Sequence, residues 1–273
     1  SDRLPLSPAL SDGDADLQAS IEASDEVLAT GLTLNSDFKN VTGVRASSNN
    51  EVALAIYFQR DETPGGNYTK NALPFLQIVQ GALNLDSIPY AASSGNGQGA
   101  YQISPLSKSL FTNPADKRIP YTWIVERHAT GPKISWITKY SGNIYADGRV
   151  SDNDLIIYRL SDIFLMKAEA YAGLNNIPLA IEYLNKVRQR ANTGVYAGSV
   201  VKGDVEREIL DERGRELFFE NKRWYDLVRF HKGGTINVYT YVPNLVGKTT
   251  PLFWPLNTTV FANNPNIKQT EGY

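Results

Sequence analysis

Few residues in the chain belong to the types that bind a metal or form a covalent intermediate. The 273 residues include no cysteine and 2 histidines. The absence of cysteine excludes a disulfide, a thiolate metal site and a cysteine nucleophile. His128 and His231 lie far apart in the sequence, and a zinc enzyme would need two carboxylate ligands in addition to them. We therefore expect no metal site and no other cofactor.

The acids near the start of the chain have the alternate spacing with which a calcium-binding loop begins. These acids are Asp12, Asp14 and Asp16. A calcium loop also needs glycine at its sixth position and glutamate at its twelfth, where this chain has Leu17 and Ala23. We interpret the acids instead as the N-terminus of a helix, where carboxylates interact favourably with the helix dipole.

Acidic residues that would form a catalytic pair are scarce in the aromatic part of the chain. A glycosidase needs two carboxyl groups roughly 5 to 9.5 Å apart in a sugar-binding cleft. Between positions 87 and 150 the acids are Asp116, Glu126 and Asp147. We predict that the protein is not an enzyme, and a glycosidase stays the less favoured alternative.

Composition and charge narrow the class of protein further. Hydrophobic residues make up 42% of the chain and charged residues 21%, which is typical of an ordered globular protein. The net charge is −2, so no broad positive field attracts nucleic acid, and we expect no nucleic-acid partner. The longest apolar stretch, residues 52–58, is far shorter than the roughly 20 residues that span a bilayer.

The predicted secondary structure that would position a site differs from one segment of the chain to the next. Residues 14–30 have helical spacing, with Leu17, Ile21 and Leu28 on one face. Residues 52–58 are rich in β-branched and aromatic side chains, which predicts a buried strand. The stretch from 61 to 99 is rich in Gly, Asn, Ser and Pro and is predicted to be irregular.

Two further strands and a series of helices are predicted after this stretch. Residues 121–127 and 134–140 favour strands, and the turn residues between them favour a long hairpin. Residues 155–172 are apolar around most of a helix, with a narrow polar stripe of Arg159, Asp162 and Glu169. Because the polar stripe is narrow, we expect neighbouring elements to cover the rest of the helix surface.

A second helix should follow the first closely. Asn175 and Asn176 favour a turn and a helix cap, and Pro178 favours the first turn of the next helix. The buried face of that helix is predicted to contain Ala180, Leu184, Val187 and Ala191. A third helix is predicted over residues 204–231, and the tail from 235 onward is Pro-punctuated and irregular.

This helical pair partly fits the 34-residue tetratricopeptide (TPR) repeat. Phe164, Ala168, Tyr171, Ala180 and Leu184 occupy the positions where that repeat has large or small packing residues. Other positions miss the pattern, and any tight helical hairpin meets much of it. One repeat cannot bury its own faces, so we expect the pair to stack on further helices.

Charged and aromatic residues of the second half also form longer motifs. They are residues 158–170 (YRLSDIFLMKAEA), 184–191 and 209–229 (ILDERGRELFFENKRWYDLVR), followed by Trp254, Pro255 and Leu256 and by residues 264–273. Earlier in the chain, residues 113–118 contain an Asp-x-Arg segment, and Lys139 precedes Tyr140. Together these segments resemble the C-terminal region of SusD/RagB-type proteins, in the same order and over nearly the whole chain.

The resemblance implies a location, a fold and a partner. Proteins of this family are surface lipoproteins of the outer membrane of Bacteroidota, built on an all-helical TPR scaffold with an irregular insertion. They bind glycans or other nutrients and cover a SusC-like TonB-dependent transporter. Compared with the family, this chain lacks the N-terminal half, including the lipidated cysteine. We therefore expect a fragment truncated at its N-terminus, with membrane attachment only through a lipid anchor absent from this chain.

A sugar ring has an apolar C–H face and a rim of hydroxyls. Its binding cleft therefore needs exposed aromatic planes beside polar side chains, and residues 61–150 contain both kinds. In a hairpin over 121–140, we expect Trp123 and Trp136 to share one face, and we expect the helix around Trp224 to be scaffold. The candidate ligand-binding residues are Tyr101, Trp123, Trp136, Tyr140 and Asn143.

The sequence thus predicts a mainly α fold with TPR-like helical hairpins and an irregular insertion containing short β-strands. Residues 14–30 and 151–231 supply the helices, 61–150 the insertion and 232–273 a C-terminal wrap, all within a single unit of residues 1–273. The predicted function is non-catalytic capture of an oligosaccharide or related nutrient for delivery to the transporter. The alternative is a TPR scaffold that mediates protein–protein interaction.

Overall fold

The computed structural model describes residues 13–43, 45–60, 103–127, 133–137, 139–140, 142–146, 148–150, 152–264 and 266–273. The chain divides into two compact units, Ser1–Arg223 and Trp224–Tyr273, and each is described by itself. Much of the predicted insertion, including Tyr101, lies outside the described residues. The predicted single unit of residues 1–273 stays a prediction.

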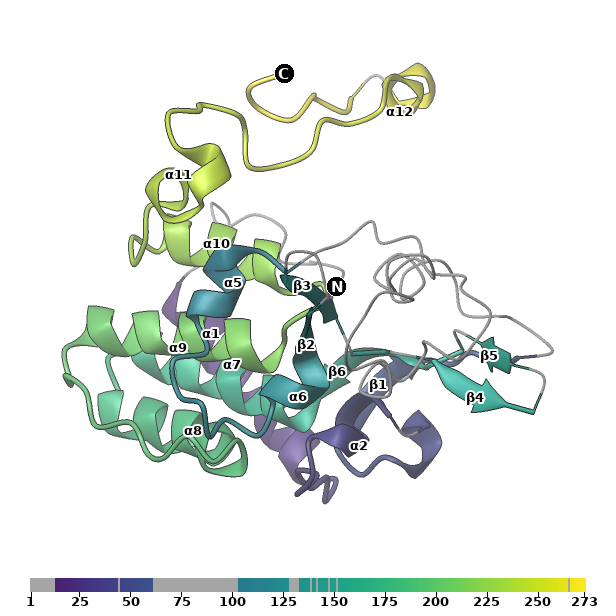
Figure 1. The fold of residues 1–273 in the computed structure, drawn as a ribbon. Coiled ribbons are helices and arrows are strands. Elements are labelled where there is room, and N and C mark those ends of the chain that lie inside the picture. Colours follow the sequence, from purple (N-terminus) through teal and green to yellow (C-terminus); the bar gives the residue numbers. More distant parts are fainter. Residues whose placement is uncertain are drawn as a thin grey trace. The chain divides into compact units, whose positions relative to one another are not determined.

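Four longer helices form the core of the first unit (Figure 1). They are α1 (Asp14–Leu28), α7 (Leu160–Gly173), α8 (Ile177–Arg190) and α9 (Lys202–Glu216). Helix α7 is the central one because it packs against α1, α8 and α9. Its residues Leu165, Ala168 and Ala172 are completely buried, as expected for a helix covered on several sides. The prediction of a mainly helical fold is confirmed.

Helices α7 and α8 form the predicted hairpin. The small side chains of Ala168 and Ala180 are both completely buried, which lets the two helices approach closely. Tyr171 of α7 stacks on Tyr183 of α8, with ring centroids 5.7 Å apart. The predicted face of α8 is also correct, since Leu184 and its partners on that face are fully buried.

The turn between these helices gives a direct test of capping. The side chain of Asn176 accepts a hydrogen bond from the backbone N–H of Leu179 at 3.4 Å. Replacing Asn176 by alanine should therefore lower the free energy of unfolding by about 1 kcal/mol, measured by urea denaturation. The control Gln189→Ala, at an exposed position of the same helix, should change it by less than about 0.5 kcal/mol. Equal effects of the two variants would contradict the capping role.

A two-stranded ribbon precedes α7 and corrects two predictions. Strand β1 (Val52–Ile56) pairs antiparallel with β6 (Leu155–Arg159), so residues 155–159 are not helical. Arg159 is extended, and the N–H of Leu160 donates to the carbonyl of Glu51 at 2.8 Å. The sheet hydrogen bonds therefore hold the chain extended up to the first residue of α7. Strand β1 is also not buried, since Leu54 is 53% exposed.

Two small hairpins lie within the predicted insertion. Strand β2 (Trp123–Arg127) pairs with β3 (Lys133–Ile137), and β4 (Asn143–Tyr145) pairs with β5 (Gly148–Val150). Trp123 is opposite Ile137, and Trp136 is opposite Ile124. Since successive strand positions alternate between faces, positions 123 and 136 belong to opposite faces of the hairpin. The prediction that they share one face is wrong, because the pairing register differs by one residue from the one it needs.

Short helical segments complete the first unit. They are α2 (Lys39–Thr42), the 3₁₀ turn η2 (Ala46–Ser48), α5 (Pro105–Ser109) and α6 (Ile119–Thr122).

The predicted third helix is two helices. Helix α9 ends at Glu216, and α10 (Arg223–Lys232) begins after a break. Phe219 and Asn221 have φ values of 60° and 59°, a left-handed conformation that cannot continue an α-helix. Lys139 stabilises the break, since its Nζ donates to the carbonyls of Glu216 and Phe218, both at 2.9 Å. A side chain far away in the sequence therefore ends α9.

The second unit contains the rest of α10 and is otherwise mostly irregular. Its short segments are α11 (Val238–Tyr241), the 3₁₀ turn η4 (Pro243–Leu245) and α12 (Thr258–Asn263). The Pro-punctuated sequence explains the short segments, because proline lacks a backbone donor and restricts the residue before it. Across the described ranges, no helix is both long and apolar enough to cross a membrane.

Candidate functional site

A network of buried charges lies around the C-terminal end of α9. Its side chains are at most 5% exposed. We call it the buried ionic network, and its members are Glu51, Asp116, Arg118, Lys139, Arg159, Arg190, Glu212, Glu216 and Glu220. Arg159 was predicted to belong to the polar stripe of a helix, but it is completely buried at the end of β6. The prediction is therefore wrong for Arg159, which lies in a strand and is paired with carboxylates.

Two arginines organise the buried ionic network. Arg118 Nη1 lies 2.6 Å from Glu212 and 3.1 Å from Glu216, and Arg118 Nη2 lies 2.7 Å from Asp116. Arg159 bonds to Glu216 as well as to Glu51 at 2.7 Å and Glu220 at 2.8 Å. Glu216 thus joins the two arginines. The Asp-x-Arg segment therefore has a structural role, since it attaches part of the insertion to α9.

The pKa values in the buried ionic network favour its charged forms. Burial alone would raise the pKa of Glu212, Glu216 and Glu220, but the neighbouring cations outweigh this effect and hold each pKa below its usual value. Burial lowers the pKa of Lys139 to about 8, and Glu220 opposes that shift. Carboxylates that are ionised and fully paired have no proton to give to a leaving group. The network is therefore a scaffold and not a catalytic centre.

The candidate residues Trp123 and Tyr140 lie in different environments. Trp123 is half-buried, its ring meets Phe111 edge-on at 6.2 Å, and Lys108 Nζ lies 5.6 Å from its centroid. Its Nε1 has no hydrogen-bond partner among the described residues. Tyr140 is only 2% exposed, so its ring packs inside the protein and has no open face. Tyr101 and the side chains of Trp136 and Asn143 lie outside what the structure describes.

An exposed tyrosine that the sequence analysis missed lies just after β1. Tyr57 is 56% exposed, and the guanidinium carbon of Arg45 lies 5.8 Å from its ring centroid. Arg45 is held by Asp152 Oδ2 at 2.6 Å, which also accepts a hydrogen bond from the hydroxyl of Tyr145 at 2.6 Å. We call Arg45, Tyr57, Tyr145 and Asp152 the Arg45 cluster. Tyr57 escaped notice because it belongs to an apolar run that predicts a buried strand.

The Arg45 cluster joins three parts of the chain. The guanidinium donates to the carbonyl of Phe58 at 2.6 Å, while Tyr145 comes from β4 and Asp152 precedes β6. The hydrogen bond to Asp152 raises the pKa of Tyr145, so its hydroxyl remains a donor at neutral pH. An open aromatic face beside fixed polar groups is what a ligand with apolar faces and hydroxyl edges requires.

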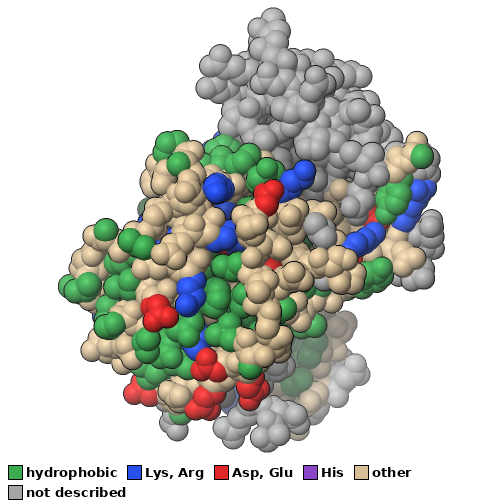
Figure 2. All heavy atoms as spheres, turned by 90° about the horizontal axis from the view of Figure 1, so that it is seen from below, with side chains coloured by type: hydrophobic (Ala, Val, Ile, Leu, Met, Phe, Trp, Pro, Cys, Tyr) green, Lys and Arg blue, Asp and Glu red, His purple; other side chains and the backbone are tan. Residues whose placement is uncertain are grey.

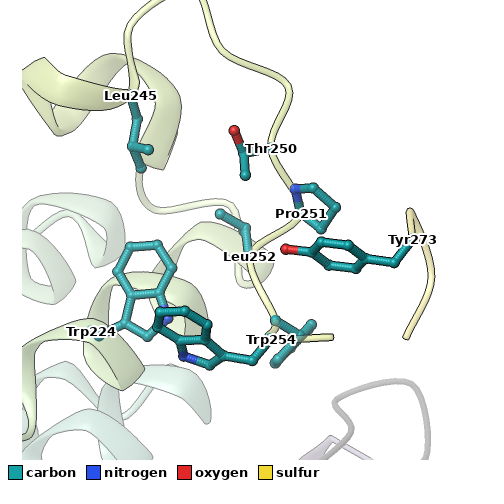
Figure 3. A pocket seen from close by; sticks show the side chains of 8 residues that line it. Trp224, Leu245, Thr250, Pro251, Leu252, Trp254 and Tyr273 are labelled. Atoms are coloured by element: carbon teal, nitrogen blue, oxygen red, sulfur yellow. The ribbon is translucent and has the colours of Figure 1, made fainter. Parts of the chain in front are cut away.

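A second aromatic surface lies within the second unit. It is a pocket of about 280 Å³ lined by Trp224, Leu245, Thr250, Pro251, Leu252, Phe253, Trp254 and Tyr273, shown in Figure 3. We call it the C-terminal pocket. Trp224 was predicted to be scaffold, and its ring forms part of this pocket.

Figure 2 shows how charged side chains are distributed on one face of the molecule. On the face seen in Figure 2, basic side chains are scattered among apolar and polar ones, with acidic side chains gathered at one edge. Within the described part of that face, no continuous basic surface is present of the kind that phosphate backbones require. A search of the described residues for three or more metal-ligating side chains in one place finds no such group.

Comparison with known proteins identifies the sequence relatives of the chain. The model of the SusD family matches residues 122–273. The starch-binding protein SusD of Bacteroides thetaiotaomicron is 32% identical over 133 residues, which cover 45% of this chain and 22% of the relative. A SusD-like protein of Formosa agariphila is 32% identical over 149 residues, or 50% of this chain and 28% of the relative. The chain spans less than a third of each of these relatives.

Solved structures share the fold over nearly the whole chain. A SusD superfamily protein of Bacteroides fragilis has a TM-score of 0.75 at 24% identity, covering 95% of this chain and 59% of that structure. Surface glycan-binding protein A of Bacteroides uniformis has a TM-score of 0.68 at 20% identity, with 94% and 56% covered. At these identities the likeness establishes the fold.

Proposed function

The chain belongs to the SusD family, and from this we propose that it binds an oligosaccharide or related nutrient without making or breaking a bond. The names of two similar proteins support the ligand class, since one is called starch-binding and the other surface glycan-binding. The protein would act at the cell surface, attached through a lipid anchor. It would pass the ligand to a SusC-like TonB-dependent transporter in the outer membrane.

The Arg45 cluster is the observation that carries this proposal within the chain. Tyr57 has an open ring for the apolar face of a sugar. The hydroxyl oxygen of Tyr145, whose proton is donated to Asp152, can accept a hydrogen bond from the sugar rim. The candidate Asn143 shares strand β4 with Tyr145 of the cluster. Trp123, Trp136 and Tyr101 remain proposed ligand-binding residues, whereas the burial of Tyr140 removes it from that set.

One of the acids weighed for a glycosidase is already held in an ion pair. Asp116 is one of the three acids weighed for a glycosidase, and it is 3% exposed and bonded to Arg118 at 2.7 Å. A catalytic acid must reach the glycosidic oxygen and hold a proton for it. Asp116 can do neither, because its two oxygens are occupied by the guanidinium of Arg118.

Replacing Tyr57 by alanine should weaken oligosaccharide binding about tenfold, the loss expected for one aromatic stacking contact of roughly 1.4 kcal/mol. Isothermal titration of the full-length protein against maltoheptaose, xylohexaose and a β-glucan oligosaccharide gives the measurement. The matched control is Tyr158→Ala, since Tyr158 is also exposed on the ribbon but has Lys222 Nζ 4.1 Å from its ring centroid. This control should leave the affinity unchanged.

Two results would count against the proposal. Absence of heat with every oligosaccharide, together with binding of a peptide, would favour the alternative of a protein-interaction scaffold. Equal losses in the two tyrosine variants would remove the Arg45 cluster from the site.

A further inference from the structure

Three separate segments of the second unit contribute rings to the C-terminal pocket (Figure 3). Trp224 stands at the start of α10, Phe253 and Trp254 follow Pro251, and Tyr273 is the last residue described. The Tyr273 side chain reaches back toward Pro251 and Leu252 in Figure 3. The pocket therefore depends on tertiary structure, because no single helix or loop supplies it.

Hydrogen bonds hold the walls of the C-terminal pocket in place. Gln269 accepts from the backbone N–H of Leu256 at 2.8 Å and donates to its carbonyl at 3.2 Å. The hydroxyl of Thr270 donates to the carbonyl of Trp254 at 2.8 Å, and Tyr239 donates to that of Thr250 at 2.6 Å. The segments that present Trp254 and Tyr273 are thus fixed to each other before any ligand arrives.

A glycine allows the closest approach between these walls. Gly272 has a φ of +97°, and a Cβ on it would lie 2.5 Å from Cγ of Pro251. Both the backbone conformation and the space therefore require glycine beside Tyr273. This close contact brings the terminal tyrosine ring into the pocket wall.

The rings of this pocket are unusually exposed. Trp254 is 82% exposed and Tyr273 is 55% exposed. Large aromatic side chains bury most of their surface in ordinary cores. Exposed rings that are held in fixed positions around a hollow are typical of a binding surface.

We propose that the C-terminal pocket binds one uncharged pyranose ring of the glycan, as a contact separate from the Arg45 cluster. This inference rests on the proposed function and adds a second sugar-binding position within the second unit. The volume of about 280 Å³ lies just below the range of pockets that hold drug-sized ligands, so it suits one ring.

The lining chemistry selects the class of sugar. No charged residue is among the eight that line the pocket, and Lys232 Nζ, 4.5 Å from the ring centroid of Phe253, lies over that ring. An uncharged sugar therefore fits the apolar lining better than a sugar acid or sugar phosphate, which would lose its hydration there. The indole of Trp254 can cover the apolar C–H face of a ring. The hydroxyls of Thr250 and Tyr273 and the indole N–H groups of Trp224 and Trp254 are the side-chain groups in the lining that can bond to ring hydroxyls.

Indole resonances provide the test, because the chain has 4 tryptophans. Their side-chain N–H signals are assigned from the four Trp→Phe variants and followed by NMR during titration with maltoheptaose, xylohexaose and the β-glucan oligosaccharide. The proposal expects the signals of Trp224 and Trp254 to move with at least one of these sugars. In Trp254→Ala, the midpoint of the remaining Trp224 shift should rise about tenfold.

A matched variant separates loss of the pocket from loss of fold. Tyr225 is 66% exposed in the same unit and is not among the lining residues. Tyr225→Ala should leave the Trp224 titration unchanged. An equal effect of both variants would overturn the proposal.

The remaining outcomes distinguish the two proposals. Shifts of Trp123 or Trp136 without any shift of Trp224 and Trp254 would overturn the pocket but leave the proposed function standing. Shifts of Trp224 and Trp254 that persist in Tyr57→Ala would support the pocket as an independent contact. If the two signals move only with phosphatidylglycerol vesicles, the pocket is a lipid contact and the proposal fails.

Discussion

Replacing Arg159 by methionine should strongly destabilise the first unit. The side chain is completely buried and is bonded to Glu51, Glu216 and Glu220. Methionine fills similar space but leaves three buried carboxylates without their common cation. Removing one member of a buried ion pair lowers the free energy of unfolding by about 3–5 kcal/mol, a large part of the roughly 5–15 kcal/mol that stabilises a typical protein.

Thermal unfolding followed by circular dichroism measures this effect. A loss of that size corresponds to a fall in Tm of roughly 10 °C. The control is Lys186→Met, because Lys186 pairs with Glu182 on the surface of α8 at 3.4 Å with both side chains exposed. Surface pairs of this kind contribute about 0–1 kcal/mol, so this variant should melt close to the parent. A similar Tm for Arg159→Met and the parent would show that the carboxylates find other partners.

Acidification should unfold the first unit steeply. The pKa values of Glu212, Glu216 and Glu220 are held below the usual value by their cationic partners. Groups of this kind stabilise the fold fully above the unfolded pKa of about 4.3, and the contribution is lost as the pH falls through the lowered folded values. Below about pH 4 the unfolded chain binds these three protons and the folded chain does not, so stability should fall by up to about 4 kcal/mol per pH unit.

Urea denaturation at a series of pH values from 6 to 3 measures how steeply the free energy of unfolding falls with pH. The variant Glu220→Gln removes one of the three groups and should reduce the slope by about one proton, or roughly 1.4 kcal/mol per pH unit. Glu182→Gln removes an exposed carboxylate instead and should leave the slope unchanged. A flat stability across this range would contradict the lowered pKa values, because it would mean that the folded and unfolded chains bind equal numbers of protons.

The elements that depend on local sequence were predictable. The α7–α8 hairpin follows from apolar periodicity, the asparagine cap and Pro178, and all of these are signals within a few residues of where they act. The short hairpin β2–β3 follows in the same way from strand-forming residues on both sides of a turn. These signals do not specify the pairing register to within one residue. The prediction that Trp123 and Trp136 share one face was wrong for this reason.

The elements that depend on distant partners were not predictable. Residues 155–159 have the periodicity of a helix, but they form a strand because β1 pairs with them from about a hundred residues away. Helix α9 ends at Glu216, where Lys139 bonds to the carbonyl of Glu216 and to that of Phe218 just beyond the helix.

The anchoring of Arg118 and Lys139 has a consequence for how this fold can diversify. Both side chains fasten the chain to the same end of α9, one before and one after the hairpin β2–β3. We therefore expect the fold to tolerate insertions, deletions and substitutions between these two attachments, because the frame on either side of them is held independently.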